Sequence, residues 1–138
     1  MLQMKSIFAK SLLFGAAVLV GVGAFWGAWR FENARSAEFL RQEEESLKGE
    51  INRVLPIGAE WVRVEEFVKS RSMLVGGHYR LSEDDRRSYG DVAEILIASS
   101  TDLETSLYVC RIMVTFRFDT NRTLQGYETK LVCDGPFG

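Results

Sequence analysis

The chain has few of the residues from which metal centres and catalytic sites are usually built. Its 138 residues include one histidine, His78, and two cysteines, Cys110 and Cys133. A structural zinc site needs about four nitrogen or sulfur ligands, so this inventory predicts no metal site. The motifs GxGxxG, GxxxxGK[ST], HExxH and GxSxG are also absent. The sequence therefore predicts no catalytic residue, no cofactor and no enzymatic activity.

An excess of positive charge is also missing. From Arg30 onward the chain carries 15 basic and 19 acidic residues, a net charge of −4. Proteins that bind nucleic acids need a basic stripe or patch to neutralise phosphates, so the charge balance argues against a nucleic-acid partner. The length leaves room for one small domain and a targeting segment, because domains usually hold roughly 100–150 residues.

Charge is absent altogether from residues 11–29, which follow a short basic tail at residues 1–10. The 19 uncharged residues match the ~20 that one membrane crossing requires. We therefore predict a single-pass transmembrane helix that serves as a signal anchor and places the protein in a membrane. The residues expected at the membrane interface, at the far end of this helix, are Phe25, Trp26, Trp29 and Arg30.

Small residues in this segment leave two further interpretations open. Val22, Gly23 and Ala24 resemble a cleavage site, so the segment could be a signal peptide that is removed after Ala24. Cleavage there would leave an apolar mature N-terminus, and for this reason we favour the anchor. A second set of small residues would allow two copies of the helix to pack closely as a homodimer. This set is Ala17, Gly21, Ala24 and Ala28.

Two helices are expected between the membrane segment and the sheet. Residues 30–55 predict a juxtamembrane helical stalk whose apolar residues line one edge, and Pro56 ends it. Glu44 interrupts that edge, which favours a stalk laid on its own domain over a coiled coil. Residues 59–71 predict an amphipathic helix. We expect Gly76-Gly77 to break the chain and His78, beside them, to be an ordinary surface residue in a loop.

The last third of the chain changes to an alternating pattern that is typical of strands. Residues 92–98, 107–118 and 124–133 predict three strands separated by polar loops. The predicted fold class is thus α+β. An N-terminal transmembrane helix and helical stalk lead to one amphipathic helix packed on a three-stranded antiparallel meander, and residues 56–138 form a small exported α+β domain.

The cysteines fit one register of the final hairpin. A two-residue turn at Asn121-Arg122 pairs residues whose numbers sum to 243, which places Cys110 opposite Cys133. The same register pairs apolar residues of the two strands, so a one-residue slip would lose both features. Directly opposed residues can be close enough for a disulfide, which we predict here, with two buried free thiols as the alternative. Disulfides persist in oxidising compartments, so we expect the domain to face the periplasm from the bacterial inner membrane.

The order of helix, polar loop and antiparallel meander resembles that of the SmpA/BamE-like outer-membrane assembly accessory proteins. Ile57-Gly58 followed by Val64 and Phe67-Val68 is similar to the opening of that family, and Val114 to Thr120 with Leu124 is similar to its closing hairpin. The chain lacks the lipid-attachment cysteine of the family. It also reads Ser72 to Gly77 where the family helix ends on glycine and proline. The resemblance implies a fold and assigns no binding residues.

An anchor, a stalk and a small domain without a chemical site favour a non-enzymatic function. We expect a membrane-anchored periplasmic protein-interaction module for envelope assembly or a membrane complex, with a protein partner. One alternative is an immunity protein that neutralises a periplasmic toxin. Another is a small-ligand or lipid-binding sensor domain, which would need a deep apolar pocket.

Overall fold

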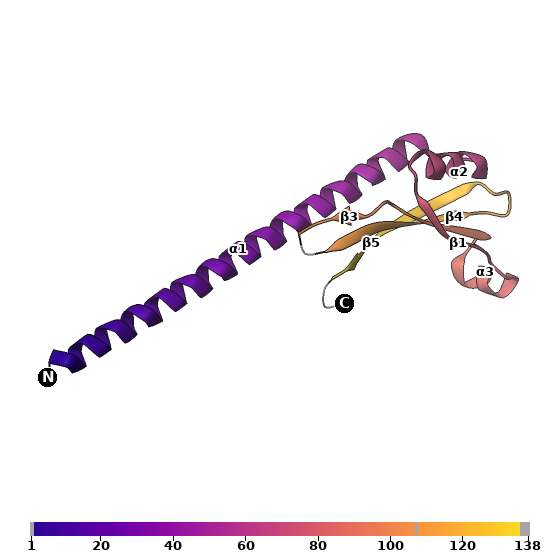
Figure 1. Cartoon of the computed structure of the whole chain (residues 1–138). Helices are drawn as coiled ribbons and strands as arrows, with labels where there is room; N and C mark the ends of the chain where they lie inside the picture. Colours follow the sequence, from indigo (N-terminus) through magenta and orange to yellow (C-terminus); the bar gives the residue numbers. More distant parts are fainter. Residues whose placement is uncertain (1, 107, 136–138) are drawn as a thin grey trace. The chain divides into compact units, whose positions relative to one another are not determined.

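The structure is a computed structural model that describes residues 2–106 and 108–135, with side chains from residue 10 onward (Figure 1). The predicted basic tail at residues 1–10 falls almost wholly outside the described side chains. The chain divides into two compact units, residues 1–37 and residues 38–138. Helix α1 (Leu2–Val54) supplies the first unit and the beginning of the second.

The first unit contains the apolar part of α1. The side chains of residues 10–32 are exposed, including the small residues Ala17, Gly21, Ala24 and Ala28. The helix is long and apolar enough to cross a membrane, in agreement with the prediction from the uncharged segment. The helix also continues without a break into the predicted stalk.

The second unit is a two-layer α+β domain. The end of α1 and the short helix α2 (Trp61–Ser70) cover one face of a sheet, as Figure 1 shows. Leu47 and Ile51 of α1 are buried in the core together with Val64 and Phe67 of α2. These residues recur at helical spacing, so each helix presents one apolar stripe to the sheet. From residue 38 onward the predicted stalk therefore lies on its own domain, as expected.

Within residues 2–106 and 108–135 the sheet is antiparallel and has five strands where three were predicted, and two helices follow α1 where one was predicted. The strands pair in the order β1-β2-β4-β5, and the two-residue β3 pairs with the start of β4. Helix α3 (Glu83–Tyr89) connects β1 to β2 and is capped by the Ser82 side chain, which accepts a hydrogen bond from the backbone of Asp85. The strands are β1 (Leu74–Arg80), β2 (Glu94–Ser99), β3 (Leu103–Glu104), β4 (Val109–Phe118) and β5 (Leu124–Asp134).

The expected break at Gly76-Gly77 is wrong, because both glycines lie within β1. They accommodate a β-bulge, since the pairing of β1 with β2 shifts register between Val75 and Gly77. Gly77 also lies under the ring of Tyr79, where a Cβ atom would come within 2.5 Å of that ring. The glycines therefore permit a close approach within a strand. His78, which was expected in a loop, belongs to this strand.

The predicted hairpin register is confirmed for most of its length. Cys110 pairs with Cys133, Ile112 with Leu131, Val114 with Thr129 and Phe116 with Tyr127. Near the turn the register shifts by one, so that Phe118 pairs with Leu124. The two-residue turn was thus wrong: the Arg122 amide donates to the Asp119 carbonyl, and Arg122 itself has φ 59°. A turn followed by a left-handed residue makes the longer loop with a bulge that hairpins commonly use.

Candidate functional site

Strand β1 is an exposed edge of the sheet. It pairs with β2 along one side, and no described strand pairs with its other side. Six of its seven residues are exposed, and Leu74 and Val75 are large apolar side chains among them. An edge strand carries a row of unpaired backbone donors and acceptors, which can pair with another chain. Exposed apolar residues along such an edge indicate an interaction site or an aggregation hazard.

A groove lies between β1 and α2. It encloses about 230 Å³ and is mainly apolar. Trp61 and Val68 of α2 form one wall, because they belong to the stripe that α2 turns toward the sheet. The remaining lining residues are Val75, His78 and Leu96 from the strands and Glu65 and Lys69 from α2.

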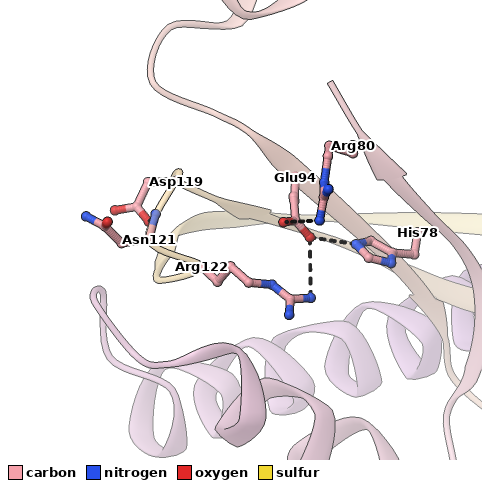
Figure 2. Close-up of polar contacts among 6 residues, drawn as sticks. All are labelled: His78, Arg80, Glu94, Asp119, Asn121 and Arg122. Carbon is pink, nitrogen blue, oxygen red and sulfur yellow. Dashed lines mark hydrogen bonds and ion pairs between the residues drawn. The ribbon is translucent and has the colours of Figure 1, made fainter. Parts of the chain in front are cut away.

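A buried carboxylate surrounded by cations lies beside this groove, and Figure 2 shows its contacts. Glu94 begins β2, and its side chain is only 7% exposed. Its Oε2 atom lies 2.7 Å from Nε2 of His78 and 3.4 Å from a guanidinium nitrogen of Arg122. Its Oε1 atom lies 3.6 Å from a guanidinium nitrogen of Arg80. A buried charge needs such partners, because an unpaired one would cost several kcal/mol, on the order of 3–5.

These partners keep Glu94 ionised. Burial acts to raise the pKa of the Glu94 carboxyl, but the hydrogen bond with His78 and the charges of Arg122 and Arg80 outweigh burial. The pKa of Glu94 therefore lies below its ordinary value near 4.5. A carboxylate can only accept hydrogen bonds, so Nε2 of His78 carries the proton in their contact.

Trp61 joins the three elements that meet at this cluster. The Arg122 guanidinium carbon lies 4.3 Å from the centre of the Trp61 ring, a cation–π distance. The rings of His78 and Phe118 also contact the indole, with centroids 4.7 and 4.6 Å away. The start of α2, the strand β1 and the tip of the β4–β5 hairpin are thus held together by one aromatic side chain.

The hairpin tip is fixed by Asp119. The Asp119 side chain accepts hydrogen bonds from the backbone of Asn121 and from both the backbone and the hydroxyl of Thr123. It also accepts one from Gln125. These bonds, led by the Thr123 hydroxyl, hold the pKa of Asp119 below its ordinary value. They stabilise the turn that carries Arg122 toward Glu94 (Figure 2).

A second cleft lies between α3 and the hairpin tip. It encloses about 620 Å³, and polar groups of Arg86, Arg87, Asp91, Asp119 and Gln125 line it together with Gly90 and Thr120. Its volume falls in the usual range for ligand sites, but its polar lining differs from the apolar pocket that the sensor alternative needs. The small-ligand interpretation therefore stays a prediction.

The predicted disulfide and membrane-interface residues lie in two separate places. The sulfur atoms of Cys110 and Cys133 lie at bonding distance across the hairpin, so the predicted pairing is present. Phe25, Trp26 and Trp29 are exposed on α1, and Arg30 follows them. None of these residues belongs to the β1 edge or to the Glu94 cluster.

Sequence reasoning missed the Glu94 cluster, although one signal for it exists. Glu94 occupies the same face of β2 as Leu96 and Ala98, which are buried. An acidic residue at an inward-facing strand position requires a cationic partner. His78 and Arg80 could have been sought on these grounds, but Arg122 is brought in only by the fold.

The fold and the site define a class: a small two-layer α+β domain that follows an N-terminal apolar helix and exposes one edge strand beside an apolar groove. Comparison with protein-family models, with curated proteins and with solved structures gave no match. The function must therefore be argued from the surface of the domain itself.

Proposed function

We propose that this protein is a membrane-anchored, non-enzymatic protein-interaction module whose partner adds an extended segment to the free edge of β1. The observation that carries the proposal is the exposure of β1, which pairs with β2 on one side and with no described strand on the other. Strand addition is a common mode of peptide recognition, in which backbone hydrogen bonds supply affinity and side-chain pockets supply specificity.

The other edge of the sheet is less suited to this role. β5 also pairs with one strand, but Glu128 and Lys130 place exposed charges of both signs along it. Charged residues, lysine above all, are a common protection of edge strands against pairing with other chains. β1 carries no ionised residue between Leu74 and Gly77, so it lacks that protection.

The groove beside β1 supports the same proposal. Its 230 Å³ is smaller than the ~300–1,000 Å³ of sites for drug-sized ligands, so it suits a single large side chain. Because it lies along the edge strand, a segment paired with β1 would have a side chain in position to enter it. A groove next to a free edge is the arrangement that strand-addition domains use for specificity.

The remaining parts of the proposal concern the membrane. We propose that residues 11–29 hold the domain at the bacterial inner membrane and that the domain faces the periplasm. The apolar helix supports the anchor, and the Cys110–Cys133 pair supports an oxidising compartment. Alkaline extraction of membranes tests the anchor: we expect the intact chain in the pellet. A soluble chain that begins after Ala24 would contradict it.

Site-specific photo-crosslinking in native membranes tests the proposed edge. We expect a photoreactive amino acid at Val75 of β1 to form a discrete cross-linked product. The same amino acid at Val132 of β5, the matched control, should form none. Tandem mass spectrometry should place the cross-link in an extended segment of the partner. Equal products from both positions, or products from Val132 alone, would contradict binding at β1.

A blocking substitution completes this test. Val75→Lys places a charge on the edge, and we expect it to abolish a product formed from a second probe at Tyr79. Val132→Lys should leave that product unchanged. Both side chains are exposed in the structure, at 59% and 36%, so neither change should unfold the domain.

A further inference from the structure

We infer that the segment added to β1 carries one large apolar side chain, seated in the groove, and a carboxylate two residues away from it, paired with Arg80. This inference rests on the proposed function and specifies the partner segment. It follows from three properties of the site: the apolar lining of the groove, the spacing of residues along β1, and the net positive charge of the Glu94 cluster.

The groove selects an apolar side chain. Most of its exposed lining is apolar: the indole of Trp61, the aliphatic side chains of Val68, Val75 and Leu96, and the ring of His78, with Glu65 and Lys69 of α2 completing it. Burying a large apolar side chain there would stabilise the complex, whereas a charged one would lose its hydration against these walls. The rings of Trp61 and His78 in this lining favour phenylalanine or another flat, large side chain.

The spacing follows from the geometry of the strand. His78 pairs with Leu96 and Arg80 pairs with Glu94, and Leu96 and Glu94 both face the helical layer. His78 and Arg80 therefore lie on the same side of β1, two residues apart, because side chains alternate along a strand. His78 lines the groove, and Arg80 is the next residue of β1 on the same face. Side chains alternate in the same way along an added strand. The apolar side chain and the carboxylate of the partner are therefore two residues apart.

Arg80 is the cation with capacity left for an external carboxylate. Glu94 is in contact with three cationic or proton-donating groups, and His78 makes the shortest of these contacts, at 2.7 Å. Arg122 is held over the Trp61 ring. The Arg80 side chain is 74% exposed, and at 3.6 Å from Glu94 its guanidinium donates no hydrogen bond to any described side chain or backbone group.

The local charge also favours a carboxylate of the partner beside Arg80. One buried carboxylate faces two guanidinium groups, those of Arg80 and Arg122, so the cluster has a net positive charge even when His78 is neutral. A guanidinium group presents paired donors that match a carboxylate in a two-pronged contact. An acidic residue of the partner would therefore complete the cluster from the solvent side.

Selection from a displayed library of random peptides tests the inference. The target is the full chain in lipid nanodiscs, and each enriched peptide is then tested for binding to the Val75→Lys chain. We expect enriched peptides to contain aspartate or glutamate two residues from phenylalanine, leucine or another large apolar residue, in either order. If the enriched peptides are basic or share no pattern, and Val75→Lys abolishes their binding, the inference is overturned and the proposed function stands. Binding that Val75→Lys does not reduce would overturn both.

A thermodynamic cycle then assigns the carboxylate to Arg80. For an enriched peptide, replacing its aspartate by asparagine should weaken binding to the full chain about tenfold, the usual effect of losing a charged hydrogen bond. The same replacement should have little effect on binding to the Arg80→Gln chain. Arg117→Gln, on the opposite face of the sheet, is the matched control and should retain the tenfold difference. Equal discrimination by all three chains would overturn the assignment.

Discussion

The two edge strands of the sheet differ in how firmly they are held. β5 is joined to β4 by the Cys110–Cys133 pair and to α1 by side-chain hydrogen bonds from Tyr127 and Thr129. β1 has one hydrogen-bonded neighbour strand, a bulge in its first half, and contacts of His78 and Arg80 with Glu94. One edge is fastened on several sides, and the other is left accessible.

This difference suggests that β5 contributes to the stability of the domain and that β1 is available for binding. Regions with few buried apolar contacts open at lower free energy than the core, and binding elements are commonly drawn from such regions. β5 is held by a disulfide and by side-chain hydrogen bonds to α1, whereas the outer backbone groups of β1 pair with no described strand. Substitutions in the two strands should therefore separate stability from binding.

The largest expected effect is the loss of the disulfide. Cys110→Ala combined with Cys133→Ala opens a loop with a sequence separation of 23 residues and should lower the free energy of unfolding by about 3 kcal/mol. Urea denaturation of the detergent-solubilised chain measures this change. Amide exchange should accelerate first in the second half of β5. Acceleration confined to β1 would contradict the difference between the edges.

The next effect concerns the buried carboxylate. Glu94→Gln removes the charge that His78, Arg80 and Arg122 surround, and we expect it to lower the free energy of unfolding by roughly 1–3 kcal/mol near neutral pH. Thermal unfolding measures the loss. Glu104→Gln, an exposed acidic residue at the other end of the sheet, is the control and should change stability by less than about 0.5 kcal/mol.

The pH dependence of this effect has a definite sign. The pKa of Glu94 is lowered in the folded protein, so its contribution is present above the ordinary value near 4.5 and is lost as the pH falls through the folded pKa. The stability difference between the wild type and Glu94→Gln should therefore shrink as the pH falls below about 4.5. A difference that grows with acid would show that the cations do not stabilise the ionised carboxylate.

A pair of tyrosines gives a smaller and closely matched comparison. The Tyr127 hydroxyl in β5 donates to Asn52, at 2.7 Å, and lies 3.3 Å from the Lys48 carbonyl. Tyr127→Phe should cost about 1 kcal/mol. Tyr79 in β1 is 54% exposed, and its hydroxyl has no described hydrogen bond, so Tyr79→Phe should cost close to nothing. Equal losses in urea denaturation would remove the distinction between the two strands.

The hairpin could be predicted from the sequence because its causes are local and agree with one another. Alternation in residues 109–118, the turn residues after Phe118 and the spacing of the cysteines all favour one register. The stalk and α2 were likewise fixed by their own apolar stripes. The turn itself was misjudged by one residue, because the left-handed conformation of Arg122 has no strong sequence signal.

β1 could not be predicted because its causes are tertiary. Its glycines suggest a break, and only the ring of Tyr79 over Gly77 and the pairing with β2 explain them. The Glu94 cluster has the same character. It gathers groups from two strands and a hairpin tip, including Arg122, which lies 28 residues from Glu94 in the sequence. The sequence signal for this cluster was local to one position, the acidic residue Glu94 on the inward face of β2.

The smallest expected effect on stability is also the one that decides the comparison. Val75 is exposed on β1 and Val132 is exposed on β5, so Val75→Lys and Val132→Lys should each change the free energy of unfolding by less than about 0.5 kcal/mol. Only Val75→Lys should abolish capture of the partner in cross-linked membranes. If Val132→Lys abolishes capture instead, β5 is the binding edge. The absence of a pairing strand beside β1 would then not determine where the partner binds.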